Sequence, residues 1–166
     1  GFQYKLRDAT FSRQRYWGEP IPIYYKDGIP KNIDLGDLPL KLPEVDNFLP
    51  TKNSDSPLGN SKEWAWNEKD KKVTSNDNIN EVDTFPIELN TMPGWAGSSW
   101  YFYRYMDPTN SENFVSEDSQ NYWSDIDVYF GGSEHATGHL LYSRFYQKFL
   151  YDLSLLKKDE YAKKLV

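Results

Sequence analysis

Cysteine is absent from the 166 residues of this chain. Disulfides, thiolate zinc sites and redox chemistry through thiols are therefore excluded. The sequence also lacks an apolar run that approaches the roughly 20 residues needed to cross a bilayer, so we expect no membrane segment. No signal peptide pattern opens the chain. These absences are compatible with a cytoplasmic protein.

The chain also lacks a large excess of charge of one sign, because its formal net charge is only −6. Such a balance argues against a domain that coats nucleic acid by bulk electrostatics, although a local basic contact stays open. Aromatic residues are plentiful, with six Trp, thirteen Tyr and nine Phe. A packed core is therefore within reach, and the length suits one domain or a core with one insertion.

The first 30 residues are basic and aromatic, with Arg13, Arg15 and Trp17 close together. A β-rich run over 20–25 predicts a strand that starts late or lies at an edge, because two prolines interrupt it. A turn signal follows at 26–28. The basic and aromatic cluster suits either a nucleic-acid contact or a packed hinge, and composition leaves both readings open.

Residues 31–89 have a different character. Between positions 31 and 90 there are 12 acidic and 7 basic residues, and proline recurs five times. We interpret this stretch as an acidic, loop-rich insertion with a few short strands. A disordered linker is the alternative, but Trp64 and Trp66 favour a region that packs on something.

Regular structure is predicted to resume in residues 90–166. An aromatic run over 98–106, stopped by Asp107 and Pro108, favours a helix. A strand is expected over 127–130, and a helix with apolar positions at helical spacing from about Glu134 to Leu153. The order of strand, insertion, helix, strand and helix fits half of a doubly wound α/β sheet interrupted by an insertion.

The junction between the last predicted strand and helix is the strongest candidate for a ligand site. Gly131 and Gly132 would let a ligand approach the backbone, and a carboxylate at Glu134 suits a ribose hydroxyl. These three residues therefore suggest a nucleoside contact. A tight turn with Glu134 as a favourable first-turn carboxylate is the alternative.

His135 and His139 are the only histidines, and their spacing of four would place both on one helix face. The spacing also occurs in metal sites, but the glutamate precedes the pair and no cysteine completes a zinc site. A pocket wall made by two imidazoles is favoured over metal. Buried core histidines remain open, as does an aromatic core helix in place of a pocket lined by Ser98 and Tyr101.

Two groups of motifs resemble one family. Leu6–Asp8, the segment Ser12–Gly18 (SRQRYWG) and Pro20–Pro22 resemble the re-entry into the catalytic domain after the editing insertion of class Ia aminoacyl-tRNA synthetases. Gly131–Phe145 (GGSEHATGHLLYSRF) and Asn90–Tyr101 (NTMPGWAGSSWY) resemble the bacterial leucyl-tRNA synthetases. The resemblance flanks the whole chain and leaves only 31–85 poorly specified.

The resemblance implies the second half of a Rossmann-type parallel-sheet catalytic domain with an inserted, short-stranded region. Residues 1–30 would be the re-entry hinge and first strand, 31–89 the insertion at a zinc-domain-like position, and 90–166 the half that holds the pocket. Zinc is not expected, because the cysteines that bind it in some relatives are missing. Gly97 stands where many relatives have Asp, so any role for that carboxylate is absent.

Residue roles follow from the same resemblance. The residues that would bind leucine are Trp95, Ser98, Tyr101, His135 and His139. The residues that would bind ATP or the adenylate are Gly131, Gly132, Glu134 and His135. The residues that would border the hinge near the tRNA are Arg13, Arg15 and Trp17.

The implied reaction joins leucine to tRNA(Leu) through leucyl-adenylate, with ATP and Mg²⁺ as the substrate complex. Neither the HIGH nor the KMSKS signature occurs in the chain, so we expect it to be inactive alone. We also expect the isolated chain to be a monomer. The rival classes are a non-catalytic nucleotide- or RNA-binding module and a metal hydrolase built on the two histidines.

Overall fold

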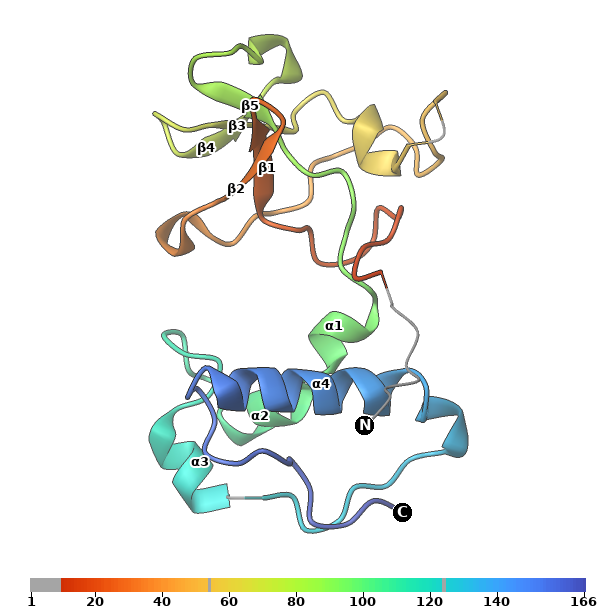
Figure 1. The fold of residues 1–166 in the computed structure, drawn as a ribbon, viewed down its shortest axis with the longest axis vertical. Coiled ribbons are helices and arrows are strands. Elements are labelled where there is room, and N and C mark those ends of the chain that lie inside the picture. Colours follow the sequence, from red (N-terminus) through yellow and green to blue (C-terminus); the bar gives the residue numbers. More distant parts are fainter. Residues whose placement is uncertain (1–9, 54, 124) are drawn as a thin grey trace, which may run out of the picture. The chain divides into compact units, whose positions relative to one another are not determined.

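The structure is a computed structural model, and it describes residues 10–53, 55–123 and 125–166. The chain forms two compact units, Gly1–Pro93 and Gly94–Val166. Among the described residues, all strands belong to the first unit and all α-helices to the second (Figure 1). The Leu6–Asp8 motif lies outside the described residues.

A two-stranded hairpin opens the first unit. Strand β1 (Ile23–Lys26) pairs antiparallel with β2 (Ile29–Asn32), and Lys26 faces Ile29 across the turn. Asp27 and Gly28 both have positive φ, 54° and 73°, which is the geometry that an Asp-Gly pair favours in a tight hairpin. The predicted late-starting strand and the predicted turn at 26–28 are confirmed.

The region 31–89 contains a second, three-stranded antiparallel sheet. Its strands are β3 (Ala65–Asn67), β4 (Lys72–Thr74) and β5 (Thr84–Pro86), in the order β4-β3-β5. Short 3₁₀ turns lie between, at Leu35–Asp37, Pro57–Asn60 and Asn76–Asn78. The predicted loop-rich region with short strands is therefore observed, and it is not a structureless linker.

An aromatic core joins the hairpin to the three-stranded sheet. Trp64 and Trp66 are 2% and 5% exposed, and the indole N–H of Trp64 donates to the carbonyl of Glu88 at 2.9 Å. The buried cluster consists of Tyr24, Ile33, Leu58, Trp64, Trp66, Phe85 and Ile87. Residues before and after position 31 thus share one core.

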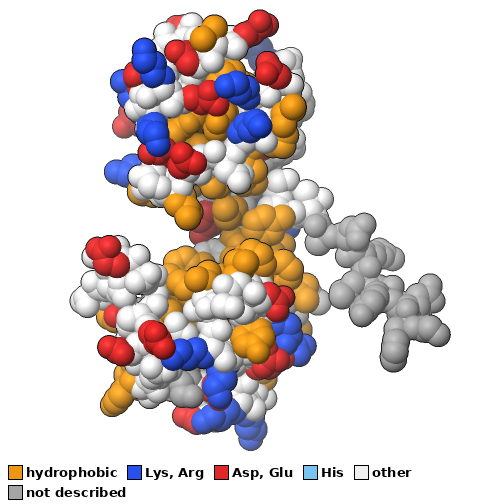
Figure 2. Space-filling view, turned by 60° about the vertical axis from the view of Figure 1, so that its left-hand side comes forward, with side chains coloured by type: hydrophobic (Ala, Val, Ile, Leu, Met, Phe, Trp, Pro, Cys, Tyr) orange, Lys and Arg blue, Asp and Glu red, His pale blue; other side chains and the backbone are white. Residues whose placement is uncertain are grey.

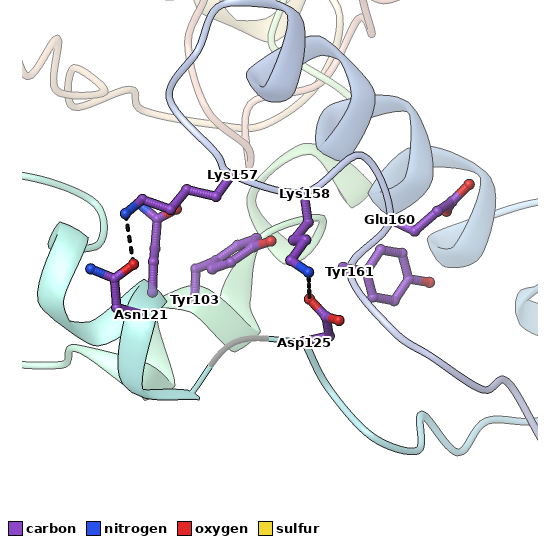
Figure 3. A pocket seen from close by; sticks show the side chains of 8 residues that line it. Tyr103, Asn121, Asp125, Lys157, Lys158, Glu160 and Tyr161 are labelled. Carbon is purple, nitrogen blue, oxygen red and sulfur yellow. Dashed lines mark hydrogen bonds and ion pairs between the residues drawn. The ribbon is translucent and has the colours of Figure 1, made fainter.

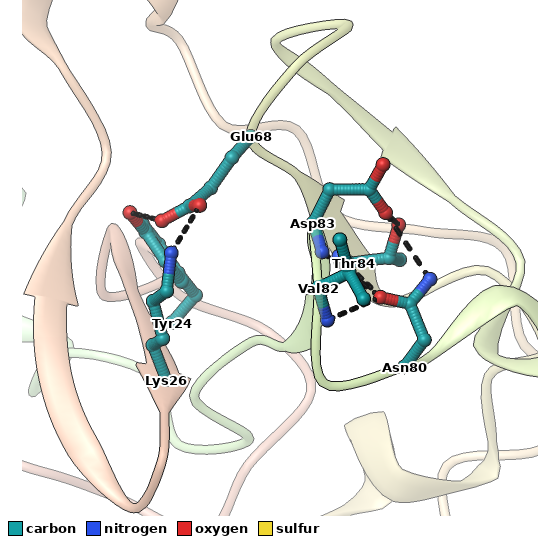
Figure 4. A network of polar contacts seen from close by, with 7 residues as sticks. All are labelled: Tyr24, Lys26, Glu68, Asn80, Val82, Asp83 and Thr84. Carbon is teal, nitrogen blue, oxygen red and sulfur yellow. Dashed lines mark hydrogen bonds and ion pairs between the residues drawn. The ribbon is translucent and has the colours of Figure 1, made fainter.

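Polar contacts join strand β1 to the residue after β3 and hold the turn before β5 in the same unit (Figure 4). The carboxylate of Glu68 accepts from Tyr24 Oη and Lys26 Nζ, each at 2.7 Å. Burial and this carboxylate raise the pKa of Tyr24 to about 12. The side-chain oxygen of Asn80 accepts from the backbone N–H groups of Val82 and Asp83 at 2.7 and 2.9 Å, which fixes the turn before β5.

The second unit begins with two short helices, α1 (Trp95–Ser98) and α2 (Tyr101–Met106). The single helix predicted over 98–106 is wrong in its first turn, because Trp100 leaves helical geometry with φ −135° and ψ 14°. The predicted stop before Asp107 and Pro108 is confirmed. Helix α3 (Glu117–Trp123) follows and has no buried residue. The core of the unit consists of Phe102, Tyr103, Val115, Leu156 and Tyr161.

The strand predicted over 127–130 is not found as a named strand. Two isolated parallel bridges occur instead, Ile126 with Ala162 and Tyr129 with Leu165. A Rossmann-type parallel sheet is therefore not observed among the described residues, whose named strands are all antiparallel. The coarser α/β assignment holds, with small antiparallel sheets and a few helices.

Helix α4 (His139–Asp152) begins later than predicted, after a 3₁₀ turn at Ser133–His135 and a non-helical Gly138. Consequently His135 and His139 do not share one helix face, and that prediction is wrong. The apolar positions of α4 face outward: Leu141, Phe145 and Phe149 are 51%, 61% and 49% exposed. Its buried side chains are His139, Ser143 and Gln147.

Acidic and basic side chains are interspersed over the face drawn in Figure 2. Helices of the described part of the chain are too short or too polar to cross a membrane.

The aromatic core generates a stability prediction with a matched control. Trp64→Ala removes a fully packed indole and its hydrogen bond, so it lowers the free energy of unfolding of the first unit by about 3–5 kcal/mol. Trp17→Ala, at a side chain that is 70% exposed, changes it by about 0.5 kcal/mol or less. Urea unfolding followed by circular dichroism measures both, and equal losses would contradict this core assignment.

Candidate functional site

Four of the residues singled out in the sequence meet at the start of α4. The Trp95 ring lies 6.1 Å from that of His135 and 6.2 Å from that of His139. The Tyr101 ring lies 5.8 Å from that of His139, and the two imidazoles are 6.3 Å apart. The chain therefore gathers an indole, a phenol and two imidazoles from α1, α2, the 3₁₀ turn and α4.

Close approach of the backbone at Gly138 makes this cluster possible. A Cβ atom at that position would lie 3.0–3.1 Å from three atoms of the Trp95 indole. Such contacts are tighter than side chains normally tolerate. Glycine at 138 therefore lets the Trp95 indole approach the backbone more closely than a side chain would allow.

Tyr129 is a member of the site that the sequence alone did not reveal. Its hydroxyl lies 2.6 Å from Nε2 of His139 and 2.8 Å from the hydroxyl of Tyr101. Its ring stacks beside the imidazole of His139 at 5.9 Å and 24°. In the sequence Tyr129 is one β-former among several, and nothing distinguishes it from a core aromatic.

His139 is the buried titratable group of the site, with 9% exposure. Burial, and then the nearby His135, lower its pKa below the ordinary 6.5. A neutral imidazole at pH 7 follows. Because the unfolded chain takes up this proton first as pH falls, the associated stability is complete above pH 6.5 and is lost below it.

The glycine pair lies beside the cluster but is more open. Space around Gly131 is free, whereas a Cβ at Gly132 would overlap the carboxylate of Glu134, which folds back over the chain. That carboxylate is 73% exposed and lies 3.8 Å from Nε2 of His135. Glu134 is thus accessible to a ligand, and its proposed contact with a ribose stays a prediction.

The remaining predicted residues are placed differently. Ser98 lies on α1, where its hydroxyl donates to the carbonyl of Trp95 at 3.3 Å. Arg13, Arg15 and Trp17 belong to the first unit. There Trp17 packs edge-on against Tyr16, with ring centroids 4.9 Å apart.

No group of three or more His, Asp and Glu side chains among the described residues is arranged to hold a metal ion. The second unit also contains a polar cavity of about 120 Å³ that neither histidine lines (Figure 3). Lys157 pairs with Glu117 at 2.6 Å, and Lys158 lies 3.7 Å from Asp125. Glu160 pairs with Arg144. Its charges thus neutralise one another, and it offers no unmatched charge for a ligand.

Comparison with known proteins gives one consistent result. The chain is 58% identical over 163 residues to a leucine–tRNA ligase of Flavobacterium psychrophilum, and 53% identical over 188 residues to that of Christiangramia forsetii. Each match covers 98% of this chain, but only 17% and 20% of the relative. No family model matches.

A solved structure agrees with the sequence matches. It is the LeuRS of Agrobacterium radiobacter K84 in a ternary complex with tRNA and LeuAMS. The TM-score is 0.75 at 36% identity, over 98% of this chain and 20% of that one.

The relatives and the solved structure all belong to one class, the aminoacyl-tRNA ligases. Within that class, the chain is homologous to leucine–tRNA ligases along almost its whole length, and it corresponds to about a sixth to a fifth of theirs.

The contact between Gly138 and Trp95 can be tested with the two histidines as reporters. Gly138→Ala forces the indole outward by a few tenths of an ångström, which changes the ring current at both imidazoles. Proton NMR of the two imidazole C–H signals of each histidine should therefore shift. Gly131→Ala, which enters open space, is the control. Unchanged signals in Gly138→Ala would contradict the packing.

Proposed function

We propose that this chain is part of the catalytic region of a leucine–tRNA ligase, and that its second unit supplies the wall of the amino-acid pocket. One observation carries the proposal. In the stretch that resembles the family, an indole wall at Trp95 stands beside the neutral polar groups of Tyr101 and His139. An apolar wall with a few fixed polar groups suits a small hydrophobic amino acid.

The proposed reaction has two steps. Leucine attacks the α-phosphate of ATP to give leucyl-adenylate and pyrophosphate, and the leucyl group then passes to the terminal adenosine of tRNA(Leu). Trp95 would contact the leucine side chain, while Ser98, Tyr101, His135 and His139 would surround its polar end. Catalysis of this kind depends on positioning and on stabilising charge at the phosphate.

The nucleotide would lie on the neighbouring glycine pair. The backbone at Gly131 is open, whereas the carboxylate of Glu134 lies over Gly132, and this exposed carboxylate can accept from ribose hydroxyls. His135, between this carboxylate and Trp95, would border both parts of the adenylate. Mg²⁺ would arrive with the ATP phosphates, since it usually keeps several waters and binds through them.

A Rossmann-type half is proposed for the second unit. The direction of the two bridges supports this proposal. Residues 126–129 run parallel to residues 162–165, and α4 lies between these two segments in the sequence. Parallel strands need a crossover connection of this kind. The first unit would then comprise the re-entry hinge, which ends near residue 30, and the insertion, which ends near residue 89.

The exposed Trp17, with Arg13 and Arg15 close in sequence, would border the hinge near the tRNA. Exposed aromatic rings and arginines are typical of contacts to single-stranded nucleic acid. Like the family, the parent protein would work in the cytoplasm.

Leucine-dependent ATP–pyrophosphate exchange tests the proposal. The full-length polypeptide that carries this segment should catalyse it, while the 166 residues alone should not, because they lack the HIGH and KMSKS signatures. In the full-length protein, His139→Ala should raise the leucine KM about 10- to 100-fold, the range expected when a polar partner is lost from a buried site.

Tyr122→Phe, at a side chain that is 80% exposed, is the control and should leave the exchange unchanged. Exchange by the isolated chain would refute its dependence on other parts. Nucleotide or RNA binding by a full-length protein that shows no exchange would favour the non-catalytic binding module.

A further inference from the structure

The first unit contains a cavity of about 300 Å³ whose lining residues all belong to that unit. This volume reaches the lower end of the range that small-molecule sites occupy. The lining comes from the hairpin, from the stretch before the 3₁₀ turn at Pro57–Asn60, and from the end of β5 with the residues after it. Among the lining residues are Tyr25, Asp55, Ser56, Ile87, Glu88 and Leu89.

The charge of this cavity is of one sign. Asp55 and Glu88 are its acidic residues, whereas lysine, arginine and histidine are missing from the lining that the structure describes. A cleft lined by charges of one sign concentrates their field and attracts ions of the opposite sign. An anion such as a phosphate group would be repelled, so the cavity favours a cationic occupant.

The carboxylate of Glu88 is held in one orientation by three donors. The hydroxyl of Tyr25 donates to Oε2, and the backbone and side-chain N–H groups of Asn90 donate to Oε1 at 2.8 and 2.9 Å. The hydrogen bond to Glu88, and then burial, raise the pKa of Tyr25, so its phenol keeps its proton at neutral pH. A carboxylate has about four acceptor positions, so one position on Oε2 stays open to an occupant.

Asp55 supplies the second negative charge, and that charge has little compensation. Its carboxylate accepts only a long contact from the Thr51 hydroxyl, at 3.4 Å, and it forms no ion pair in the described part of the chain. Its backbone is nevertheless fixed, because its N–H donates to Thr51 Oγ1 at 3.0 Å and its carbonyl accepts from the Thr51 N–H at 3.1 Å. Asp55 is thus an anion at a defined position.

A buried hydroxyl without a partner belongs to the same lining. Ser56 is 2% exposed, and its Oγ has no hydrogen-bond partner within residues 10–53, 55–123 and 125–166. Ser56 occupies the N-cap position of the 3₁₀ turn Pro57–Asn60, where serine ordinarily accepts from a backbone N–H, but it makes no such bond. An unmatched buried hydroxyl lowers stability, so an occupant of the cavity would supply the missing partner.

We propose that this cavity is a binding site for alkyl ammonium groups, as carried by linear diamines and polyamines. One ammonium group donates to Asp55 and to Oγ of Ser56, and a second donates to the open position of Glu88. The methylene chain lies on the apolar side chains of Ile87 and Leu89. An ammonium group has three donors and no acceptor, which matches this set of oxygens. The site lies in the first unit and is independent of the pocket proposed for the second.

Calorimetric titration of the 166-residue chain with putrescine at low ionic strength tests the proposal. Saturable binding of one molecule per chain is expected, and it should weaken as salt is added, because salt screens the charges. The diol of the same chain length lacks the charges and should bind about 10-fold more weakly. Equal affinity for the diol, or no saturable binding of putrescine, would overturn the inference.

A pair of isosteric variants tests the role of Asp55. Asp55→Asn keeps the shape of the side chain and removes its charge, so the affinity for putrescine should fall about 3- to 5-fold. Asp46→Asn removes an equal charge from an exposed residue that does not line the cavity, and it should leave the affinity unchanged. Equal losses in the two variants would reveal a non-specific charge effect and contradict the site.

Ser56→Ala should act in opposite directions in two measurements. Without ligand it should raise the thermal midpoint of the first unit by about 4–8 °C, because an unmatched buried hydroxyl is removed. With putrescine it should lower the affinity about 5-fold, because an acceptor is lost. A lower midpoint would mean that the hydroxyl is already matched in the free chain, and it would overturn the role given to Ser56.

The full-length polypeptide distinguishes two sources of the ammonium group. Putrescine binding that persists there, with the same dependence on Asp55, assigns the site to a free amine. Binding that occurs in the 166-residue chain and is lost in the full-length protein assigns it to a basic side chain from the rest of the polypeptide. Both results support recognition of an ammonium group. Leucine-dependent exchange, measured in parallel, bears only on the proposed function.

Discussion

The pairing of two distant backbone segments holds the second unit and its site together. Residues 126–131 and 161–166 exchange five hydrogen bonds of 2.8–3.1 Å, although only isolated bridges result. This pairing fixes Tyr129 and leads directly into the glycine pair. Because Tyr129 contacts both His139 and Tyr101, the position of the buried imidazole depends on a backbone ladder formed more than twenty residues further along the chain.

The first unit solves a different problem, that of building a core from short strands. Two tryptophans, a tyrosine and a phenylalanine meet between the hairpin and the three-stranded sheet. Large aromatic side chains bury much area per residue, so a few of them can stabilise a small sheet. The cysteine-free chain has an aromatic core and side-chain-capped turns in this region. Sequence predicted the aromatic contribution because Trp64 and Trp66 have no role in a solvated loop.

Helix α4 shows where sequence patterns stop being informative. Leu141, Phe145 and Phe149 have helical spacing, and the helix is present, but this apolar face points outward. The buried face consists of His139, Ser143 and Gln147, each with a hydrogen-bond partner in the unit. Periodicity determines that a face exists, whereas the partner that covers it decides which face is buried. The predicted start of the helix is wrong for a local reason, because the non-helical Gly138 places the two histidines in different elements.

The sequence predicted which residue types would gather at the site, because motif positions in the chain marked Trp95, Tyr101 and both histidines. It could not predict their polarity. Whether an imidazole donates or accepts depends on its burial and on the acidity of its partner, and the partner here, Tyr129, lies in a segment whose side chain direction is set by pairing with the C-terminal residues. A buried histidine repels a nearby cation only when its imidazole is protonated, and a lowered pKa keeps the imidazole neutral at neutral pH. In this arrangement the burial that lowers the pKa of His139 accompanies a contact with the Tyr129 hydroxyl, which in turn contacts that of Tyr101, so the three polar groups form one buried-to-exposed series.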